Sequence, residues 1–223
     1  LPDHSGQLMW SKKNLKEIYM KYFIILLLLT VYTSSVRSND YFKALELFNL
    51  RKIEESVDFF KKVANDEQNE KRSDAMFNLA VIYDNGFGIA QDKTRALYYY
   101  ELAADLSNIY AQYNLGWKYY NGENVYKDVN KAFNLYTSAS RYGHPQATFN
   151  LANMHYSGVG TVKNIKKAYK LFLIAKINGI DESEYYLKKI QEQISPEELM
   201  VLNSEYGSLI EEKIEVPSDP LDK

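Results

Sequence analysis

The stretch AQYNLGWKYYNG, residues 111–122, returns in altered form at the same interval in both directions along the chain. Small, apolar and glycine residues recur 36 residues earlier at Ala75, Asn78, Leu79, Ala80, Tyr83 and Gly86, and 36 residues later at Ala147, Asn150, Leu151, Ala152, His155 and Gly158. A fixed period of this length, with residue types returning in phase, is typical of a solenoid of stacked supersecondary units. The sequence therefore predicts three repeats, at residues 73–108, 109–144 and 145–180.

The first half of each repeat predicts a helix with one apolar stripe. Alanine, leucine, a small residue and an aromatic residue or histidine recur at a spacing that places them on the same helical face. The small residue is Ala80, Gly116 or Ala152. Because a small side chain lets two helices approach closely, we expect a second helix of the same repeat to pack there.

A loop with a recurring turn residue leads to that second helix. The turn residue is Gly88, Asn124 or Gly160, and asparagine is the side chain that best tolerates a positive φ, so we expect a left-handed turn in each repeat. Side chains that can cap the second helix follow at Asp92, Asp128 and Asn164. The second helix has its own apolar stripe, with expected stops at Gly143 and Gly179.

Weaker versions of the pattern flank the three repeats. Residues 39–72 predict an N-terminal helical hairpin, broken near residues 49–51, and a charged connector. Residues 181–215 begin in phase and then lose the pattern, so they predict a degenerate capping hairpin. Its last helix opens at a capping box formed by Ser195 and Glu198. The remaining stretch, 216–223, predicts a disordered tail.

Residues 20–38 have the order of a secretory signal peptide. Lys21 precedes a short apolar run at residues 22–29, and small polar residues follow up to Ser38. This order predicts cleavage after Ser38 and an exported protein, periplasmic or secreted, with no stable membrane span afterwards. An uncleaved membrane anchor is the alternative, although this run has about half of the roughly 20 apolar residues that a spanning helix needs.

Residues 1–19 lie outside the leader pattern. They are interpreted either as an over-extended reading frame or as a long, positively charged start of the leader, and in both cases as no part of the fold. Without residues 1–38 the chain has 22 basic and 27 acidic residues, a net charge of −5 against −2 for the whole chain. Since phosphate binding needs clustered positive charge, this balance argues against nucleic acid as a partner.

The sequence predicts no catalytic residues, no cofactor and no metal site. The chain has no cysteine, which excludes a disulfide framework and a thiolate metal site. Of its histidines, His155 takes a position that is tyrosine in the sister repeats, so we interpret it as a packing residue rather than a ligand or base. The glycine-rich loop at residues 86–88 follows no strand and precedes no lysine–serine pair, so it is a turn rather than a phosphate cradle.

The repeated motif resembles the Sel1-like repeat, a relative of the tetratricopeptide repeat with a longer loop between its helices. The residues that carry the resemblance follow the order Ala-x-x-Asn-Leu-(Gly/Ala)-x-x-Tyr-x-x-Gly-x-Gly and then Asp-x-x-x-Ala, with His155 and Asn124 as departures from it. The resemblance implies an all-α solenoid of stacked antiparallel helix pairs in a right-handed superhelix. It also implies protein–protein contacts, often in the bacterial envelope or with a host. The cysteine pairs of the cysteine-rich Helicobacter relatives are missing here.

If the first helices line a concave face, as in tetratricopeptide-like hairpins, the residues between their packing positions point into a groove. The predicted contacts with a partner are Asp84, Tyr113, Trp117, Tyr120, Phe149, Asn153 and Tyr156. Aromatic side chains of this kind contribute much of the binding energy at interfaces. Tyr113 and Phe149 are aromatic in every repeat and so have a structural interpretation as well, and for Trp117, Tyr120 and Tyr156 both interpretations stay open.

The sequence thus predicts a monomeric, non-enzymatic adaptor that binds a protein or peptide, centred on Trp117 and Tyr120. Two alternatives from other classes remain. One is an envelope hydrolase of the β-lactamase-like kind proposed for cysteine-rich relatives, which the absence of a Ser-x-x-Lys motif disfavours. The other is a structural subunit of an envelope complex that assembles through the convex face or the tail.

Overall fold

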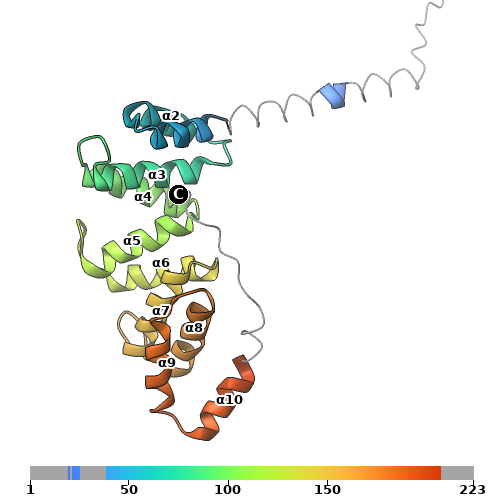
Figure 1. The fold of residues 1–223 in the computed structure, drawn as a ribbon, viewed down its shortest axis with the longest axis vertical. Helices are drawn as coiled ribbons and strands as arrows, with labels where there is room; N and C mark the ends of the chain where they lie inside the picture. Colours follow the sequence, from blue (N-terminus) through green and yellow to red (C-terminus); the bar gives the residue numbers. More distant parts are fainter. Residues whose placement is uncertain (1–19, 21, 26–38, 207–223) are drawn as a thin grey trace, which may run out of the picture.

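The computed structural model describes residues 20, 22–25 and 39–206, and every regular element within these ranges is a helix. A helix at residues 39–49 opens the stack that Figure 1 shows along its long axis. The helices that follow are α2 (Ile53–Asn65), α3 (Arg72–Asn85), α4 (Lys93–Asp105), α5 (Ile109–Asn121), α6 (Val129–Arg141), α7 (Pro145–Ser157), α8 (Ile165–Ile177), α9 (Ser183–Gln191) and α10 (Pro196–Tyr206). Within the described residues, no helix combines the length and the apolar character needed to cross a membrane.

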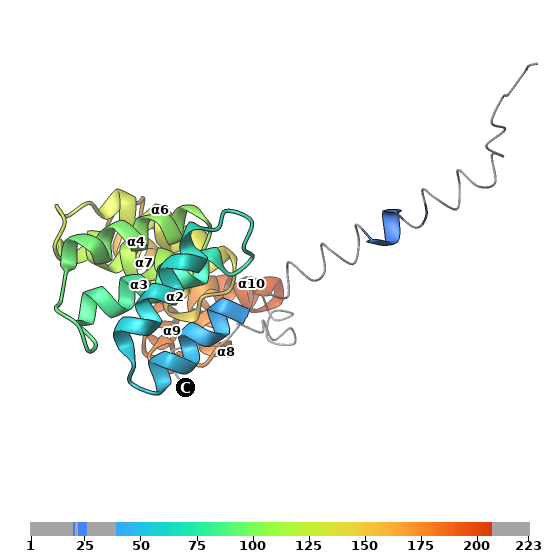
Figure 2. The same ribbon diagram turned by 90° about the horizontal axis from the view of Figure 1, so that it is seen from above.

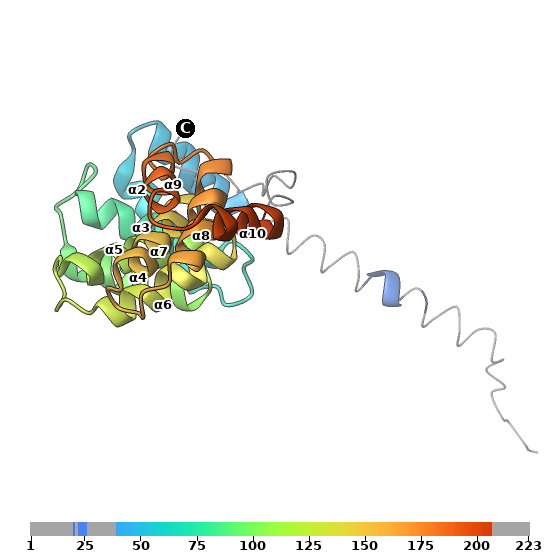
Figure 3. The ribbon, with the colours of Figure 1, turned by 90° about the horizontal axis from the view of Figure 1, so that it is seen from below.

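The helices pack as consecutive antiparallel pairs, which confirms the all-α solenoid. The most extensive contacts are within the pairs α3–α4, α5–α6 and α7–α8, and the pairs are joined through α4 with α5 and α6 with α7. Seen from above and from below, the pairs lie over one another along the stack (Figures 2 and 3). At the C-terminal end α10 turns back against α8 (Figure 3). Each unit therefore contacts its neighbours in sequence, as expected of a solenoid.

The core runs along the stack through matching positions. Leu79, Leu115 and Leu151 are 0, 3 and 5% exposed, which confirms that the three repeats bury the same residue. Gly116 shows why a small residue is needed beside it, since a β-carbon there would lie 2.9 Å from the Cε1 atom of Tyr136 on α6. The close approach of the two helices in a hairpin is therefore confirmed for the middle repeat.

The turns and caps predicted from the repeat also form. Gly88, Asn124 and Gly160 have φ angles of 65, 60 and 70°. The carboxylates of Asp92 and Asp128 accept hydrogen bonds from backbone N–H groups in the first turns of α4 and α6, at 2.8 and 2.9 Å. Asn164 caps α8 in the same way at 2.9 Å. The loops are thus held by the same local chemistry in each repeat.

The two ends of the stack follow the predicted pattern within the described residues. The N-terminal hairpin breaks at Arg51, which has a φ of 61°, and the hydroxyl of Ser56 ties its second helix to the carbonyl oxygen of Ala44 at 2.8 Å. The capping box forms with both of its bonds: the N–H of Ser195 donates to Glu198, and the N–H of Glu198 donates to the Ser195 hydroxyl, at 3.3 and 3.2 Å. The predicted tail at residues 216–223, the last residues of the predicted capping hairpin after residue 206, residues 1–19 and most of the leader lie outside the described residues.

Candidate functional site

A pocket of about 460 Å³ opens between the first helices of successive hairpins. Four of the predicted groove residues, Trp117 and Tyr120 on α5 with Asn153 and Tyr156 on α7, surround it together. Its other lining residues are Asn121, Tyr136, Asn150, Ser157 and Tyr186. Because these side chains come from α5, α6, α7 and α9, the pocket depends on the correct stacking of three hairpins.

The aromatic side chains give the pocket a firm floor and an accessible wall. Tyr136 is buried in the floor, and its burial raises the pKa of its hydroxyl, while a hydrogen bond with Asn150 opposes that shift. The phenol therefore stays neutral at physiological pH. Trp117, by contrast, is 42% exposed, so its ring is available for contact with a bound group.

Two of the three asparagine side chains of the pocket donate hydrogen bonds to their own helices. The Nδ2 amide of Asn153 donates to the carbonyl oxygen of Phe149 at 3.3 Å, and that of Asn121 donates to Trp117 at 2.9 Å. Each amide thus retains its oxygen as an acceptor. A ligand with N–H or O–H donors would complement these acceptors.

The other three predicted contacts support the wall instead of lining this pocket. Tyr113 stacks on the imidazole of His144 with ring centres 4.5 Å apart. Phe149 meets Tyr186 edge-on at 5.8 Å. Asp84 accepts hydrogen bonds from the ammonium group of Lys93, and it also pairs with Lys118. The structure therefore brings four of the seven residues to one pocket and places three in the surrounding packing.

The ion pairs of Asp84 reveal a buried charge that the repeat pattern did not predict. The Lys118 side chain is 5% exposed, and its Nζ atom lies 2.8 Å from Asp84 and 3.2 Å from Glu123. Burial opposes ionisation of Asp84, but Lys118 and Lys93 outweigh it and hold the pKa of this carboxyl below its ordinary value. The sequence contains one indication that Lys118 is buried: this residue is in phase with the apolar residues Ile82 and Met154, and both of these are buried in the structure.

Two lysines near the pocket were also missed. Lys127 and Lys163 follow the turn in the second and third repeats, and their Nζ atoms lie 5.7 and 5.9 Å from the ring centres of Tyr120 and Tyr156. An ammonium group at this distance from a ring is held by the negative face of the π-system. Positive charge is therefore fixed beside two of the aromatic side chains that line the pocket.

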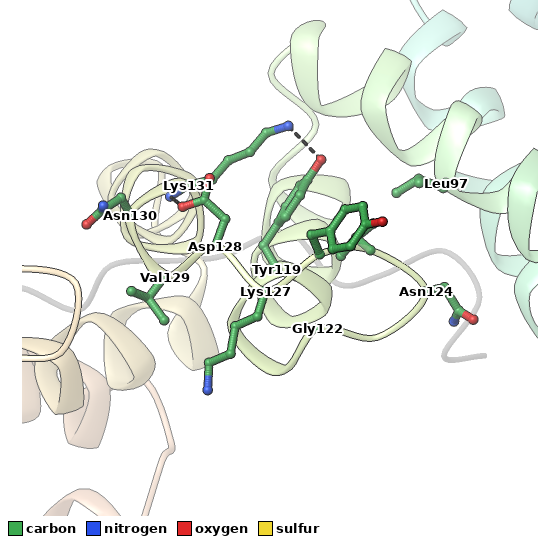
Figure 4. A pocket seen from close by; sticks show the side chains of 11 residues that line it. Leu97, Tyr119, Gly122, Asn124, Lys127, Asp128, Val129, Asn130 and Lys131 are labelled. Atoms are coloured by element: carbon green, nitrogen blue, oxygen red, sulfur yellow. Dashed lines mark hydrogen bonds between the residues drawn. The ribbon is translucent and has the colours of Figure 1, made fainter.

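A second hollow, of about 920 Å³, lies between the loop of the middle repeat and Leu97 of α4 (Figure 4). In the sister repeats the turn glycine sits tightly on the preceding hairpin: a β-carbon at Gly88 would lie 2.5 Å from Ile53, and one at Gly160 would lie 2.7 Å from the carbonyl oxygen of Val129. Asn124 has a β-carbon, so the loop of the middle repeat cannot approach the preceding hairpin as closely as the glycine loops do. Figure 4 shows Asn124 at the edge of the hollow.

The histidine that the sequence singled out has a packing role in the structure. His155 is buried and meets Phe133 edge-on, with ring centres 5.4 Å apart. Within the described part of the chain, no three side chains of the kinds that ligate metals cluster together.

Comparisons with known proteins place the repeats in a family. The Sel1 repeat family matches residues 73–108, 109–144 and 145–179. A search of curated proteins gives no match. Among solved structures, the chain is similar to a Sel1 repeat protein from Oxalobacter formigenes at 25% identity and a TM-score of 0.59, over 66% of this chain and 58% of that one.

Two further structures are similar at comparable identity. One is a protective antigen with an SLR fold from uropathogenic Escherichia coli strains, at 23% identity and a TM-score of 0.62, over 69% of this chain and 33% of that one. The other is the Helicobacter pylori cysteine rich protein B, at 26% identity and a TM-score of 0.43, over 54% of this chain and 98% of that one. The chain spans less than two thirds of the first two of these proteins. The family model matches three consecutive repeats in phase, and the chain contains three Sel1 repeats.

Proposed function

We propose that this chain is an exported, non-enzymatic adaptor that captures a segment of a protein partner in the groove beside α5, α7 and α9. Sel1-repeat solenoids generally serve protein–protein contacts. The observation that carries the proposal is the gathering of Trp117, Tyr120, Asn153 and Tyr156 around one pocket. Its volume of about 460 Å³ is within the range of pockets that bind small groups, and its aromatic lining is of the type that dominates binding energy at interfaces.

Differences between the repeats support a groove that recognises one partner. The position of Trp117 is Val81 in the first repeat and Asn153 in the third, whereas the core leucines beside it do not change. A position that changes next to leucines that do not change is what we expect of a side chain that serves recognition. The groove surface of the middle repeat therefore differs from that of its neighbours in the side chain at the position of Trp117.

We expect the double substitution of Trp117→Ala and Tyr120→Ala to weaken partner binding at least tenfold, because truncation of a buried aromatic anchor costs more than about 1 kcal/mol. The measurement is capture of partners from an extract of the native cells, with covalent crosslinking and mass spectrometry, followed by titration of the recovered partner.

A matched control is the double substitution of Tyr98→Ala and Tyr142→Ala. Both tyrosines are exposed and belong to α4 and the end of α6, away from the residues that line the pocket. The control protein should recover the same partner as the unaltered protein. Undiminished recovery by the folded Trp117→Ala/Tyr120→Ala protein would remove the groove from consideration.

Export is the second part of the proposal, and the signal-like order of residues 20–38 supports it. The destinations that we propose are the periplasm or the exterior, in envelope assembly or in contact with a host. Expression of the whole reading frame, cell fractionation and N-terminal sequencing should give a protein that begins at Asn39. A protein that keeps the leader and stays with the membrane fraction would instead support the anchor interpretation.

A further inference from the structure

Lysine side chains contact two tyrosines of the 460 Å³ pocket, although its nine described lining residues are all uncharged. One of them, Lys127, also lines the second hollow. Lys127 and Lys163 are exposed and lie beside Tyr120 and Tyr156, as described above. A third exposed lysine, Lys189 of α9, lies 5.1 Å from the ring centre of Tyr185, whose neighbour in sequence, Tyr186, lines the pocket. Lys127 and Lys163 therefore place positive charge beside two tyrosines of an uncharged, aromatic lining, in a chain whose net charge is −2.

The pair formed by Tyr120 and Lys127 returns in the third repeat as Tyr156 and Lys163, but not in the first repeat. The residues in phase with Tyr120 and Lys127 are Asp84 and Gln91 in the first repeat, where the Gln91 amide donates to the Asp84 backbone carbonyl at 2.8 Å. The ammonium group of Lys93, two residues after Gln91, donates to the same carbonyl at 2.8 Å. The loop of the first repeat therefore closes without a lysine at the position of Lys127 and Lys163, so a lysine at that position is not a requirement of the repeat.

We propose that the pocket binds an extended, acidic segment of a protein, whose carboxylates pair with Lys127 and Lys163 while an apolar side chain rests on Trp117. This inference rests on the proposed function and names the chemistry of the partner. The amide oxygens of Asn121 and Asn153 would accept hydrogen bonds from the backbone N–H groups of the segment. Carboxylates next to ammonium groups that are already held in place would form charge-assisted hydrogen bonds.

A nucleic acid is the other polyanion that an aromatic floor with lysines can bind. The structure favours a peptide for two reasons. The residual acceptors of the two asparagines suit the regularly spaced N–H donors of a peptide backbone. The acidic excess of the chain as a whole repels a long polyanion, whereas a short acidic segment interacts mainly with charges within about 10 Å.

The test uses the purified protein and four fluorescein-labelled probes in anisotropy titrations. The probes are a peptide of alternating glutamate and leucine, the same peptide with glutamine for glutamate, the same peptide with lysine for glutamate, and an oligothymidylate of similar length. We expect tightest binding of the glutamate peptide, and we expect its affinity to fall as salt is added.

Substitution of Lys127→Gln together with Lys163→Gln should weaken binding of the glutamate peptide about tenfold, since two partly exposed ion pairs are lost, and should leave the glutamine peptide unaffected. The matched control is Lys52→Gln with Lys62→Gln, which removes the same charge from exposed lysines of the N-terminal hairpin. That control should bind all probes as the unaltered protein does.

The outcomes separate this inference from the proposed function. Peptide binding without preference for glutamate, or equal losses in both lysine pairs, would overturn the acidic segment and leave the adaptor intact. If the oligothymidylate binds more tightly than the glutamate peptide, a nucleic acid is the occupant and the inference is wrong. If no peptide of any charge binds and Trp117→Ala/Tyr120→Ala changes nothing, the groove itself fails.

Discussion

Substitution of Asp84→Asn should lower the free energy of unfolding by about 3 kcal/mol, which is the low end of the cost of removing one partner from a buried ion pair. The Lys118 ammonium would remain buried without its nearest counterion, at 2.8 Å in the native protein. Glu123 would stay as a partner at 3.2 Å, and for this reason we do not expect the upper end of the range. Urea titration followed by circular dichroism measures the loss as a lower midpoint.

The sister repeats provide the control for this prediction. Met154 occupies the position of Lys118 and is buried, so Lys118→Met should change the free energy of unfolding by less than about 1.5 kcal/mol, because Asp84 keeps Lys93 as its partner. The combination of Asp84→Asn with Lys118→Met should then recover most of the loss. If the double variant is as unstable as Asp84→Asn alone, the unpaired, buried ammonium group of Lys118 is not the cause of the lost stability.

These ion pairs also join two repeats. Asp84 ends the first helix of one repeat, Lys93 begins its second helix, and Lys118 belongs to the first helix of the next. The stability of a solenoid is approximately the sum of the stabilities of its repeats and of the interfaces between them. The effect of Asp84→Asn should therefore concentrate at the interface between the first two repeats, where Asp84 of α3 meets Lys118 of α5, the helix that carries Trp117 and Tyr120.

The architecture could be predicted from the sequence because each packing position appears three times. Leu79, Leu115 and Leu151 occupy the same position in three repeats, so the prediction that this position is buried does not depend on a chance match in one repeat. The turn was predictable for a related reason: where two repeats have glycine and the third has Asn124, positive φ is the property that the residues share. Core positions and turn residues that recur in every repeat can therefore be predicted from the sequence alone.

The site was only partly predictable, because repetition says nothing about side chains that reach between repeats. Asp84 was expected to face the groove, but two lysines from outside its own helix hold it. Lys127 and Lys163 lie in loops, where periodicity assigns no direction to a side chain, and their contact with tyrosines emerges only from the folded loop. A helical face can be read from spacing, whereas the reach of a long side chain depends on three-dimensional neighbours.

A second large effect is expected on acidification, and it centres on His144. This residue caps α7: its Nδ1 atom accepts a hydrogen bond from the N–H of Ala147 at 3.2 Å, and its ring is buried against Tyr113. Burial lowers the pKa of His144 from 6.5 to about 4. Protonation would also remove the acceptor and place a positive charge at a helix N-terminus, which the helix dipole disfavours.

Stability that depends on a neutral His144 is fully present above about pH 6.5 and is lost as the pH falls toward 4. In this window the unfolded chain binds a proton that the folded protein does not. At 1.36 kcal/mol for each unit of pKa, the loss attributable to His144 approaches about 3 kcal/mol at pH 4. Urea midpoints measured at intervals across this range should fall accordingly.

The control is His144→Asn, because Asn108 caps α5 at the equivalent position with an N–H to oxygen distance of 3.0 Å. Asparagine keeps the cap and has no proton to gain, although the loss of the stacking on Tyr113 should lower stability by about 1 kcal/mol at every pH. His155, whose pKa burial and Lys167 also lower, remains in both proteins and cancels from the comparison. The unaltered protein should therefore be more stable above about pH 6.5, and the His144→Asn protein should be the more stable one at pH 4. A difference between the two proteins that stays constant across this range would show that His144 titrates as it does in the unfolded chain, and that neither its burial nor its cap distinguishes the two protonation states.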